Sequence, residues 1–169
     1  MEDALEGYFV TPPDRNLSIY RFDFDRDPQR MDAHAWIFNT AANAKLSGFQ
    51  ARGGKLIFIH GMADPIFSAH EMVDYYQRLV ATNGPAASEF ARLFLVPGMG
   101  HCQGGAGTDS IDGLSALVEW VEQGKAPQHL QAGGTSVFPG RTRPLCAYPQ
   151  YAHYSGNGSS EEAGNFSCR

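Results

Sequence analysis

Two short apolar runs, each ended by a turn that contains glycine and proline, constrain the fold of this chain most. Residues 55–59 (KLIFI) and 92–96 (RLFLV) have the length of strands and are apolar almost throughout, as strands covered on both faces are. Helical periodicity follows each run, over residues 69–82 and 112–123. The order strand, helix, strand, helix predicts an α/β fold with parallel strands and flanking helices.

The rest of the chain carries weaker signals. Residues 2–8 are consistent with a short helix, and residues 18–24 alternate in a way that suits an edge strand or an extended arm. Asp27-Pro28 favours a helix start, which predicts a helix over residues 28–39. Residues 133–169 are rich in glycine, serine and proline without periodicity, and they are expected to be a loop-rich tail.

Size and charge exclude several classes of function. The chain has 169 residues, enough for one domain with a core. Its net charge of −5 argues against a nucleic-acid partner, because phosphates require clustered lysine and arginine. No apolar run approaches the roughly 18 residues of a membrane-spanning helix. Neither nucleic acid nor a membrane is therefore expected as a partner.

The turns after the two apolar runs carry an acid and a histidine. Asp64 lies in the segment HGMAD after the first run, and His101 lies in PGMGHC after the second. In α/β-hydrolases the catalytic residues follow in the order serine, acid, histidine. Asp64 would then orient the imidazole of His101, which would act as general base. The alternative is that Asp64 merely caps a turn before Pro65 and that His101 is a surface-loop histidine.

A nucleophilic serine is missing from this pattern. No serine lies in a Gly-x-Ser-x-Gly elbow: Ser136 has Phe138 in place of the second glycine, and Ser155 has His153 in place of the first. Ser68 lies only four residues after Asp64, too close to form a separate strand-to-helix elbow. The sequence therefore carries the acid and base of an acyl-transfer site without the attacking group.

Metal and cofactor sites are not expected. No histidine pair has the spacing of a zinc site, and His60, at the end of the first run, is expected to serve turn geometry rather than proton transfer. The D-x-D-x-D segment at residues 23–27 resembles the start of a calcium loop. It departs from that pattern because Pro28 replaces the glycine and His34 the bidentate carboxylate.

Three cysteines leave one without an obvious partner. Cys146 and Cys168 flank a segment rich in glycine, serine and asparagine, and a disulfide between them would pin the tail. Closing a loop of this length stabilises by about 3 kcal/mol. Cys102 is then either a buried free thiol or paired with a cysteine outside the chain. Disulfide use points to a secreted or periplasmic location.

Several segments between about residue 45 and the end of the chain resemble the tannase/feruloyl esterase family. The similarity is most specific in Gly-Met-Gly-His-Cys and in Arg-Pro-Leu-Cys-x-Tyr-Pro. The segments that carry it are GGKL at 53–56, HGMADP at 60–65, YY at 75–76, RLF at 92–94, PGMGHC at 97–102, WVEQGKAP at 120–127, TRPLCAYP at 142–149 and NFSC at 165–168.

This resemblance implies an α/β-hydrolase with a large inserted lid that cleaves esters of phenolic acids. In that family a cysteine beside the nucleophilic serine pairs with the cysteine after the catalytic histidine, which Cys102 matches. The serine, its cysteine and most of the lid are then expected upstream of Met1. Residues 1–169 are expected to be the C-terminal part of the hydrolase domain, with the N-terminal part of the sheet and the lid missing. Residues 1–45 would be a lead-in, and residues 133–169 a disulfide-pinned tail.

Such a fragment of a serine carboxylic-ester hydrolase is expected to be inactive alone. Two other interpretations stay open. One is a non-catalytic α/β remnant or binding module. The other is a small complete hydrolase with Cys102 as nucleophile, although a thiol directly next to His101 in the chain is poorly placed to be activated by that histidine. Met62, Ile66 and Phe67 are candidates to line a pocket for the phenolic acid. A truncated sheet exposes an edge, so self-association is also expected.

Overall fold

The computed structural model describes residues 5–39 and 43–169, and the chain divides into two compact units, Met1–Asn43 and Ala44–Arg169. The first unit is built of short helical turns. They are the π-helix η1 (Leu5–Phe9), the 3-10 helices η2 (Ile19–Arg21) and η3 (Asp27–His34), and the α-helix α2 (Ala35–Phe38).

Two predictions for the first unit are wrong in part. An edge strand or an extended arm was expected over residues 18–24, but residues 19–21 form η2 and a turn follows it. Ser18 Oγ accepts the Tyr20 amide, and Asp23 Oδ1 accepts the amides of Asp25 and Arg26. Such local bonds compete with strand pairing. The helix expected over residues 28–39 begins as η3 and becomes α-helical only in α2. A short helix was expected over residues 2–8, and η1 covers the part of this range from residue 5 onward. Residues 1–4 lie outside the described residues.

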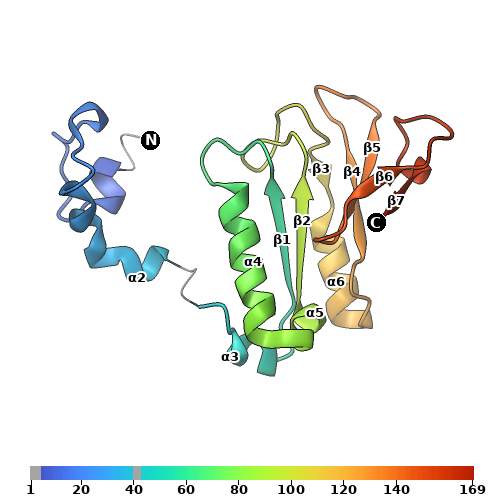
Figure 1. Ribbon diagram of the computed structural model, residues 1–169, viewed down its shortest axis with the longest axis horizontal. Helices are drawn as coiled ribbons and strands as arrows, with labels where there is room; N and C mark the ends of the chain where they lie inside the picture. The colour runs from blue at the N-terminus through green and yellow to red at the C-terminus, as the bar shows by residue number, and fades with distance from the viewer. Residues whose placement is uncertain (1–4, 40–42) are drawn as a thin grey trace. The chain divides into compact units, whose positions relative to one another are not determined.

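The second unit holds the elements that the apolar runs predict (Figure 1). In chain order they are α3 (Ser47–Ala51), β1 (Leu56–Gly61), α4 (Ala69–Asn83), η5 (Gly84–Ala86), α5 (Ala87–Phe90), β2 (Ala91–Val96), β3 (Ser110–Ile111), α6 (Gly113–Gln123), β4 (His129–Gly133), β5 (Thr142–Cys146), β6 (Ala152–Tyr154), η6 (Ala163–Asn165) and β7 (Phe166–Cys168).

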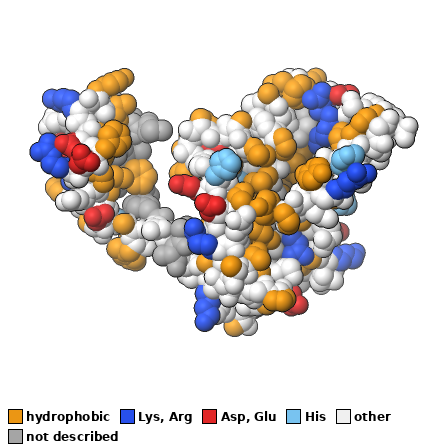
Figure 2. Space-filling view, in the orientation of Figure 1, with side chains coloured by type: hydrophobic (Ala, Val, Ile, Leu, Met, Phe, Trp, Pro, Cys, Tyr) orange, Lys and Arg blue, Asp and Glu red, His pale blue; other side chains and the backbone are white. Residues whose placement is uncertain are grey.

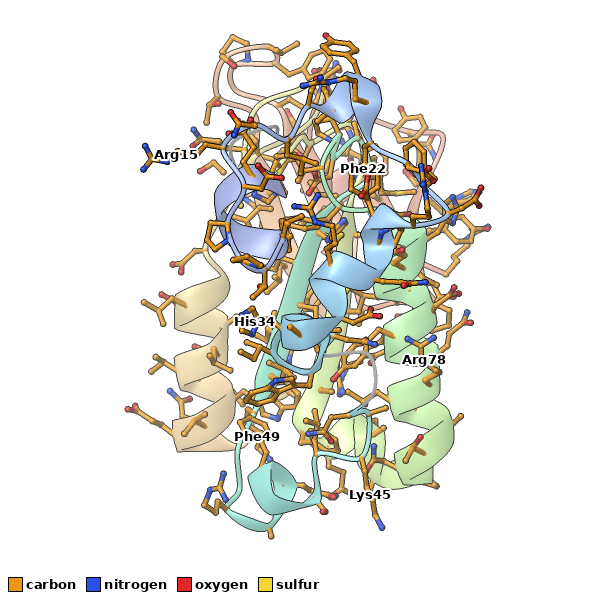
Figure 3. The ribbon with its side chains drawn as sticks, turned by 90° about the vertical axis from the view of Figure 1, so that its left-hand side faces the viewer. Arg15, Phe22, His34, Lys45, Phe49 and Arg78 are labelled. Carbon is orange, nitrogen blue, oxygen red and sulfur yellow. A yellow bond between two sulfur atoms is a disulfide. The ribbon has the colours of Figure 1, made fainter. Side chains whose placement is uncertain are left out.

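The predicted parallel pair is confirmed. β1 and β2 run parallel, with Leu56 opposite Ala91 and Gly61 opposite Val96. The edge-on view in Figure 3 shows α4 and α6 on opposite faces of these two strands. In the same view Phe49 lies on α3, and its ring packs edge-to-face against Phe90 with centroids 6.5 Å apart.

Antiparallel strands continue the sheet beyond β2. β3, β4 and β5 pair in that order, each with its neighbour antiparallel. A bridge between Phe94 and Ala147 and a bond from the Tyr148 amide to the Leu93 carbonyl, 2.8 Å long, join the segment after β5 to β2. The second unit is therefore of α/β type with mixed pairing, whereas the sequence predicted parallel strands only.

The tail is more regular than the sequence predicts. The prediction of a loop-rich segment over residues 133–169 misses β5 and the antiparallel pair β6–β7. The predicted disulfide between Cys146 and Cys168 is present and links the end of β5 to the end of β7. The tail is therefore pinned to the sheet by a covalent bond as well as by strand pairing.

Two hydrophobic clusters fill the second unit. One lies between β2 and the antiparallel strands and includes Phe94, Leu130 and Leu145, and the other lies where α4 and α5 meet β2 and includes Leu79 and Phe90. Burial of this kind contributes most of the stability of a domain. No helix within the described residues is long and apolar enough to cross a membrane.

The face of α6 departs from prediction. Its periodicity predicts that Leu114, Leu117, Val118 and Val121 all point inward, but Leu114 is 72% exposed, Val118 42% and Val121 59%. The same helix buries Trp120 instead, against the side chains of β2. An apolar stripe on α6 is thus left uncovered by the described residues.

Candidate active site

The turns that follow β1 and β2 lie together at one end of the parallel pair. Because Gly61 is opposite Val96, both strands finish at the same edge of the sheet. The Met62 amide donates to the Val96 carbonyl over 2.9 Å, and the Ala63 amide donates to the Met99 carbonyl over 3.0 Å. Main-chain bonds therefore hold the turn that carries Asp64 against the turn that carries His101.

The loop that carries His101 folds back on itself through glycines. Gly98 has a φ of 73°, and a Cβ there would lie 2.2 Å from the carbonyl oxygen of Ala106. Met99 pairs with Gly105 in an isolated antiparallel bridge. Only glycine fits at residue 98 without displacing the backbone, so the glycine that follows Pro97 is a requirement of this loop's shape.

Asp109 fastens the far side of the same loop. Its carboxylate accepts the Gly104 amide over 2.9 Å and the Thr135 hydroxyl over 2.7 Å. The hydrogen bonds from Thr135 and Gly104 lower the pKa of the Asp109 carboxyl. Asp109 was not predicted as part of the site. The sequence feature that could have indicated it is an acidic residue directly after a glycine-rich segment.

The structure brings the two predicted side chains, Asp64 and His101, into contact. Asp64 Oδ2 lies 2.9 Å from His101 Nδ1. A carboxylate only accepts, so Nδ1 carries the proton, and in the neutral ring Nε2 is then free to accept one. The Asp64 side chain is 4% exposed and that of His101 42% exposed. The acid is thus enclosed while the imidazole can be reached from solvent.

Asp64 is held in its ionised form. Burial acts to raise the pKa of its carboxyl, but hydrogen bonds from His101 and from the amides of Ile66 and Phe67 outweigh burial. They lower the pKa from 3.8 to about 2. The carboxylate is therefore negative over the whole physiological range.

Two further side chains lie beside this pair: Phe67, which the sequence suggested as a pocket-lining residue, and His60, which it assigned to turn geometry alone. The ring of Phe67 lies against that of His101, with centroids 5.4 Å apart. The buried ring of His60 places Nε2 3.2 Å from the Phe67 carbonyl oxygen. The sequence feature that could have indicated a place for His60 in the site is its position at the end of the first apolar run, four residues before Asp64.

The remaining residues that the sequence singled out lie around the pair. Met62, Ile66 and Phe67 are each about half exposed, at 53%, 53% and 55%. Cys102 is exposed and unpaired within this chain, and it has a φ of 64°. It follows His101 directly, but the structure leaves its partner open.

Nucleophile and metal ligands are not evident at the site. Among the residues that the structure describes, Asp64 is the hydrogen-bond partner of the His101 ring, and no hydroxyl donates to it. Within residues 5–39 and 43–169 no group of three or more His, Cys, Asp or Glu side chains could hold a metal ion. The arrangement can relay a proton through His101.

A groove of about 630 Å³ lies beside α4, away from these turns. Figure 2 shows hydrophobic side chains gathered on the same face, alongside α4. None of the groove residues belongs to the turns that carry Asp64 and His101. The lining is formed by Tyr76, Gln77, Val80, Ala81, Gly84, Pro85, Ala87, Ser88, Tyr148 and Pro149.

Comparison with known proteins relates the chain to ester hydrolases. It is 46% identical over 177 residues to mono(2-hydroxyethyl) terephthalate hydrolase of Piscinibacter sakaiensis, a match that covers 95% of this chain and 29% of that enzyme. It is 32% identical over 154 residues to feruloyl esterase B of Aspergillus niger, covering 78% of this chain and 29% of that enzyme. The chain thus spans less than a third of the length of these curated relatives.

The structure gives the same result. It matches the crystal structure of feruloyl esterase B from Aspergillus oryzae with a TM-score of 0.82 at 27% identity, covering 99% of this chain and 36% of that one. The family model described as tannase and feruloyl esterase matches residues 5–169. The chain therefore belongs to the tannase and feruloyl esterase family.

Proposed function

We propose that this chain supplies the acid and the base of a serine carboxylic-ester hydrolase that acts on esters of phenolic acids and related aromatic acids. The observation that carries the proposal is the 2.9 Å contact between Asp64 Oδ2 and His101 Nδ1. The relatives support the substrate class, since ferulate and terephthalate esters both contain an aromatic acid.

In this mechanism His101 Nε2 takes the proton of a serine hydroxyl as the serine oxygen attacks the ester carbonyl. The Asp64 carboxylate stabilises the imidazolium that forms and holds the ring in the required tautomer. His101 then returns the proton to the leaving alcohol, which leaves an acyl-serine. Water, deprotonated in turn by His101, hydrolyses this intermediate to the free acid.

The serine is proposed to come from a part of the enzyme outside residues 1–169, which would then be the C-terminal part of an α/β-hydrolase domain. No serine of the chain lies in a nucleophile elbow, and the curated relatives are more than three times as long as the segment they share with it. Cys102 would pair with a cysteine beside that serine and so tie the base to the nucleophile. The disulfide between Cys146 and Cys168 supports a secreted or periplasmic location.

A chimera tests the proposal. Residues 1–169 replace the matching segment of mono(2-hydroxyethyl) terephthalate hydrolase, and hydrolysis of that enzyme's own ester is measured. We expect turnover that His101→Ala lowers by at least about 10³-fold. His70→Ala, at an exposed histidine of α4, is the matched control and should leave turnover unchanged.

Two outcomes would contradict the proposal. A folded chimera without turnover would favour the non-catalytic remnant or binding module. Hydrolysis of a chromogenic phenolic ester by the 169-residue chain alone, abolished by His101→Ala, would show that the chain has its own nucleophile. In that case Cys102→Ser would decide whether the thiol attacks.

A further inference from the structure

His60 has no role in the proton relay, yet its ring lies directly behind the acid. The side chain is 10% exposed, and Nε2 lies 4.0 Å from Asp64 Oδ2, on the same carboxylate oxygen that contacts His101. A distance of 4.0 Å is too long for a hydrogen bond. His60 therefore does not compete with His101 for the acid's proton-accepting oxygen.

The bond that His60 does make is to the main chain. Its Nε2 is 3.2 Å from the carbonyl oxygen of Phe67. A carbonyl oxygen only accepts, so Nε2 carries a proton and donates it to this bond. In this arrangement His60 is a donor to the turn and is unavailable as a base through Nε2.

Phe67 is held from both of its backbone groups. Its amide donates to Asp64 Oδ1 over 3.1 Å, alongside the Ile66 amide at 2.8 Å, and its carbonyl accepts from His60. The turn between the end of β1 and α4 is therefore closed by two side chains that face each other. Freeing the carbonyl of Phe67 would loosen the amide bonds that orient the Asp64 carboxylate.

Both contacts that the turn makes with His101 depend on this closure. One is the Asp64 bond to Nδ1, and the other is the ring of Phe67 against the imidazole. We propose that His60 is a positioning residue that fixes Phe67, and through it Asp64, in the orientation in which both contact His101. Its importance for turnover rests on the proposed function, whereas its effect on the turn does not.

Kinetics in the chimera form the first part of the test. His60→Leu keeps a side chain of similar volume but removes the hydrogen-bond donor to the Phe67 carbonyl. His60→Asn keeps a polar side chain that is too short to reach this carbonyl. His60→Gln carries an amide donor near the position of Nε2. A displacement of about 1 Å of the base costs on the order of 100-fold in rate. We expect His60→Leu and His60→Asn to lower kcat about 100-fold with KM within about twofold, and His60→Gln to restore most of kcat.

Proton NMR of the 169-residue chain forms the second part, and it requires no turnover. The His101 Nδ1 proton, hydrogen-bonded to Asp64, should give a low-field signal in the unmodified chain and in His60→Gln. The signal should be lost to solvent exchange in His60→Leu and His60→Asn.

The two parts separate the possible failures. An unchanged His101 signal in both the Leu and Asn variants would overturn the positioning role, as would equal losses of kcat in the Gln and Leu variants. If the signal of the 169-residue chain behaves as expected while the chimera shows no turnover, the proposed function is contradicted and the positioning role stays intact. If His60→Leu does not fold, the kcat values and the His101 signals of His60→Asn and His60→Gln are compared with each other, and this comparison decides on the positioning role.

Discussion

Gly61 and Gly100 approach so closely that a Cβ at residue 61 would lie 2.3 Å from the carbonyl oxygen of Gly100. Gly61 ends β1, and Gly100 immediately precedes His101. No side chain larger than hydrogen fits between the two turns at this point. The distance between Asp64 and His101 therefore depends on a glycine that makes no contact with either functional group.

Gly61→Ala is expected to push the two turns apart. The methyl group meets backbone atoms, which cannot rotate away, so the free energy of unfolding should fall by about 1–3 kcal/mol. Turnover of the chimera should fall on the order of 100-fold as His101 is displaced. Denaturant unfolding and steady-state kinetics measure both. Gly164→Ala, where an added Cβ meets nothing within 4 Å, is the control and should change neither.

Asp64→Asn tests the tautomer of His101. An amide at residue 64 presents a donor to Nδ1, which favours the tautomer with its proton on Nε2 and removes the base. We expect kcat of the chimera to fall about 10⁴-fold while KM stays close to that of the parent. Circular dichroism should show an unchanged fold. A loss below tenfold would contradict the assigned role of Asp64.

Acid should weaken the fold through Asp64. The pKa of its carboxyl is about 2 in the folded chain and 3.8 as the unperturbed reference. A lowered pKa contributes stability above the unfolded value, and that contribution is lost as pH falls through the folded value. The free energy of unfolding should therefore decline between about pH 4 and pH 2.

Urea unfolding at several pH values, with Asp64→Asn in parallel, measures this effect. The variant lacks the titrating group, so its curve should be flatter in the same window. Asp109 and Glu161, whose pKa values are also lowered by their hydrogen bonds, titrate in both proteins and cancel in the comparison. Parallel curves for the two proteins would contradict the prediction.

The disulfide should contribute about 3 kcal/mol to stability. Cys146 and Cys168 are 22 residues apart, and closing a loop of this length removes entropy from the unfolded chain. The double variant Cys146→Ala/Cys168→Ala should unfold at correspondingly lower denaturant concentration. Cys102→Ala, which removes an exposed free thiol, is the control. An equal effect of the two variants would contradict this account.

Self-association is expected through the open side of β1 and the apolar stripe on α6. Within the described residues β1 pairs with β2 alone, and unpaired strand edges invite pairing with another chain. Light scattering after size exclusion should show association that rises with protein concentration. Val118→Lys on α6 should reduce it, and Val80→Lys on α4 should not. A monomer at the highest concentration tested would contradict the expectation.

The parts of the fold that could be predicted are those in which burial dictates sequence. Residues 92–96 are apolar almost throughout because β2 is buried on both faces, and residues 56–59 lie in β1, which is buried only in part, with Ile59 36% exposed. Asp64 and His101 each follow the carboxyl end of one of these two strands. Because the strands are adjacent and parallel, the two side chains were expected to lie at the same edge of the sheet. Asp64 and His101 were singled out by this strand-and-loop context together with the resemblance to the tannase/feruloyl esterase family.

The parts that could not be predicted depend on contacts between distant segments. β5 contains Arg143 and Pro144, which hide its strand character, and it is a strand because β4 pairs with it. β6 and β7 have three residues each and are held by the disulfide and by paired bonds between Tyr151 and Arg169. His60 was expected to serve turn geometry, but which carbonyl it would meet depended on the path of the turn.

The main-chain bonds from Met62 to Val96 and from Ala63 to Met99 have a practical consequence for protein engineering. Amide and carbonyl groups are common to nearly all amino acids, so these bonds survive most replacements of the side chains around them. Met62 and Ile66, which are half exposed, can therefore be randomised in a library without dismantling the geometry of the pair. Such a library would vary the side chains around Asp64 and His101 while main-chain bonds keep the two turns together.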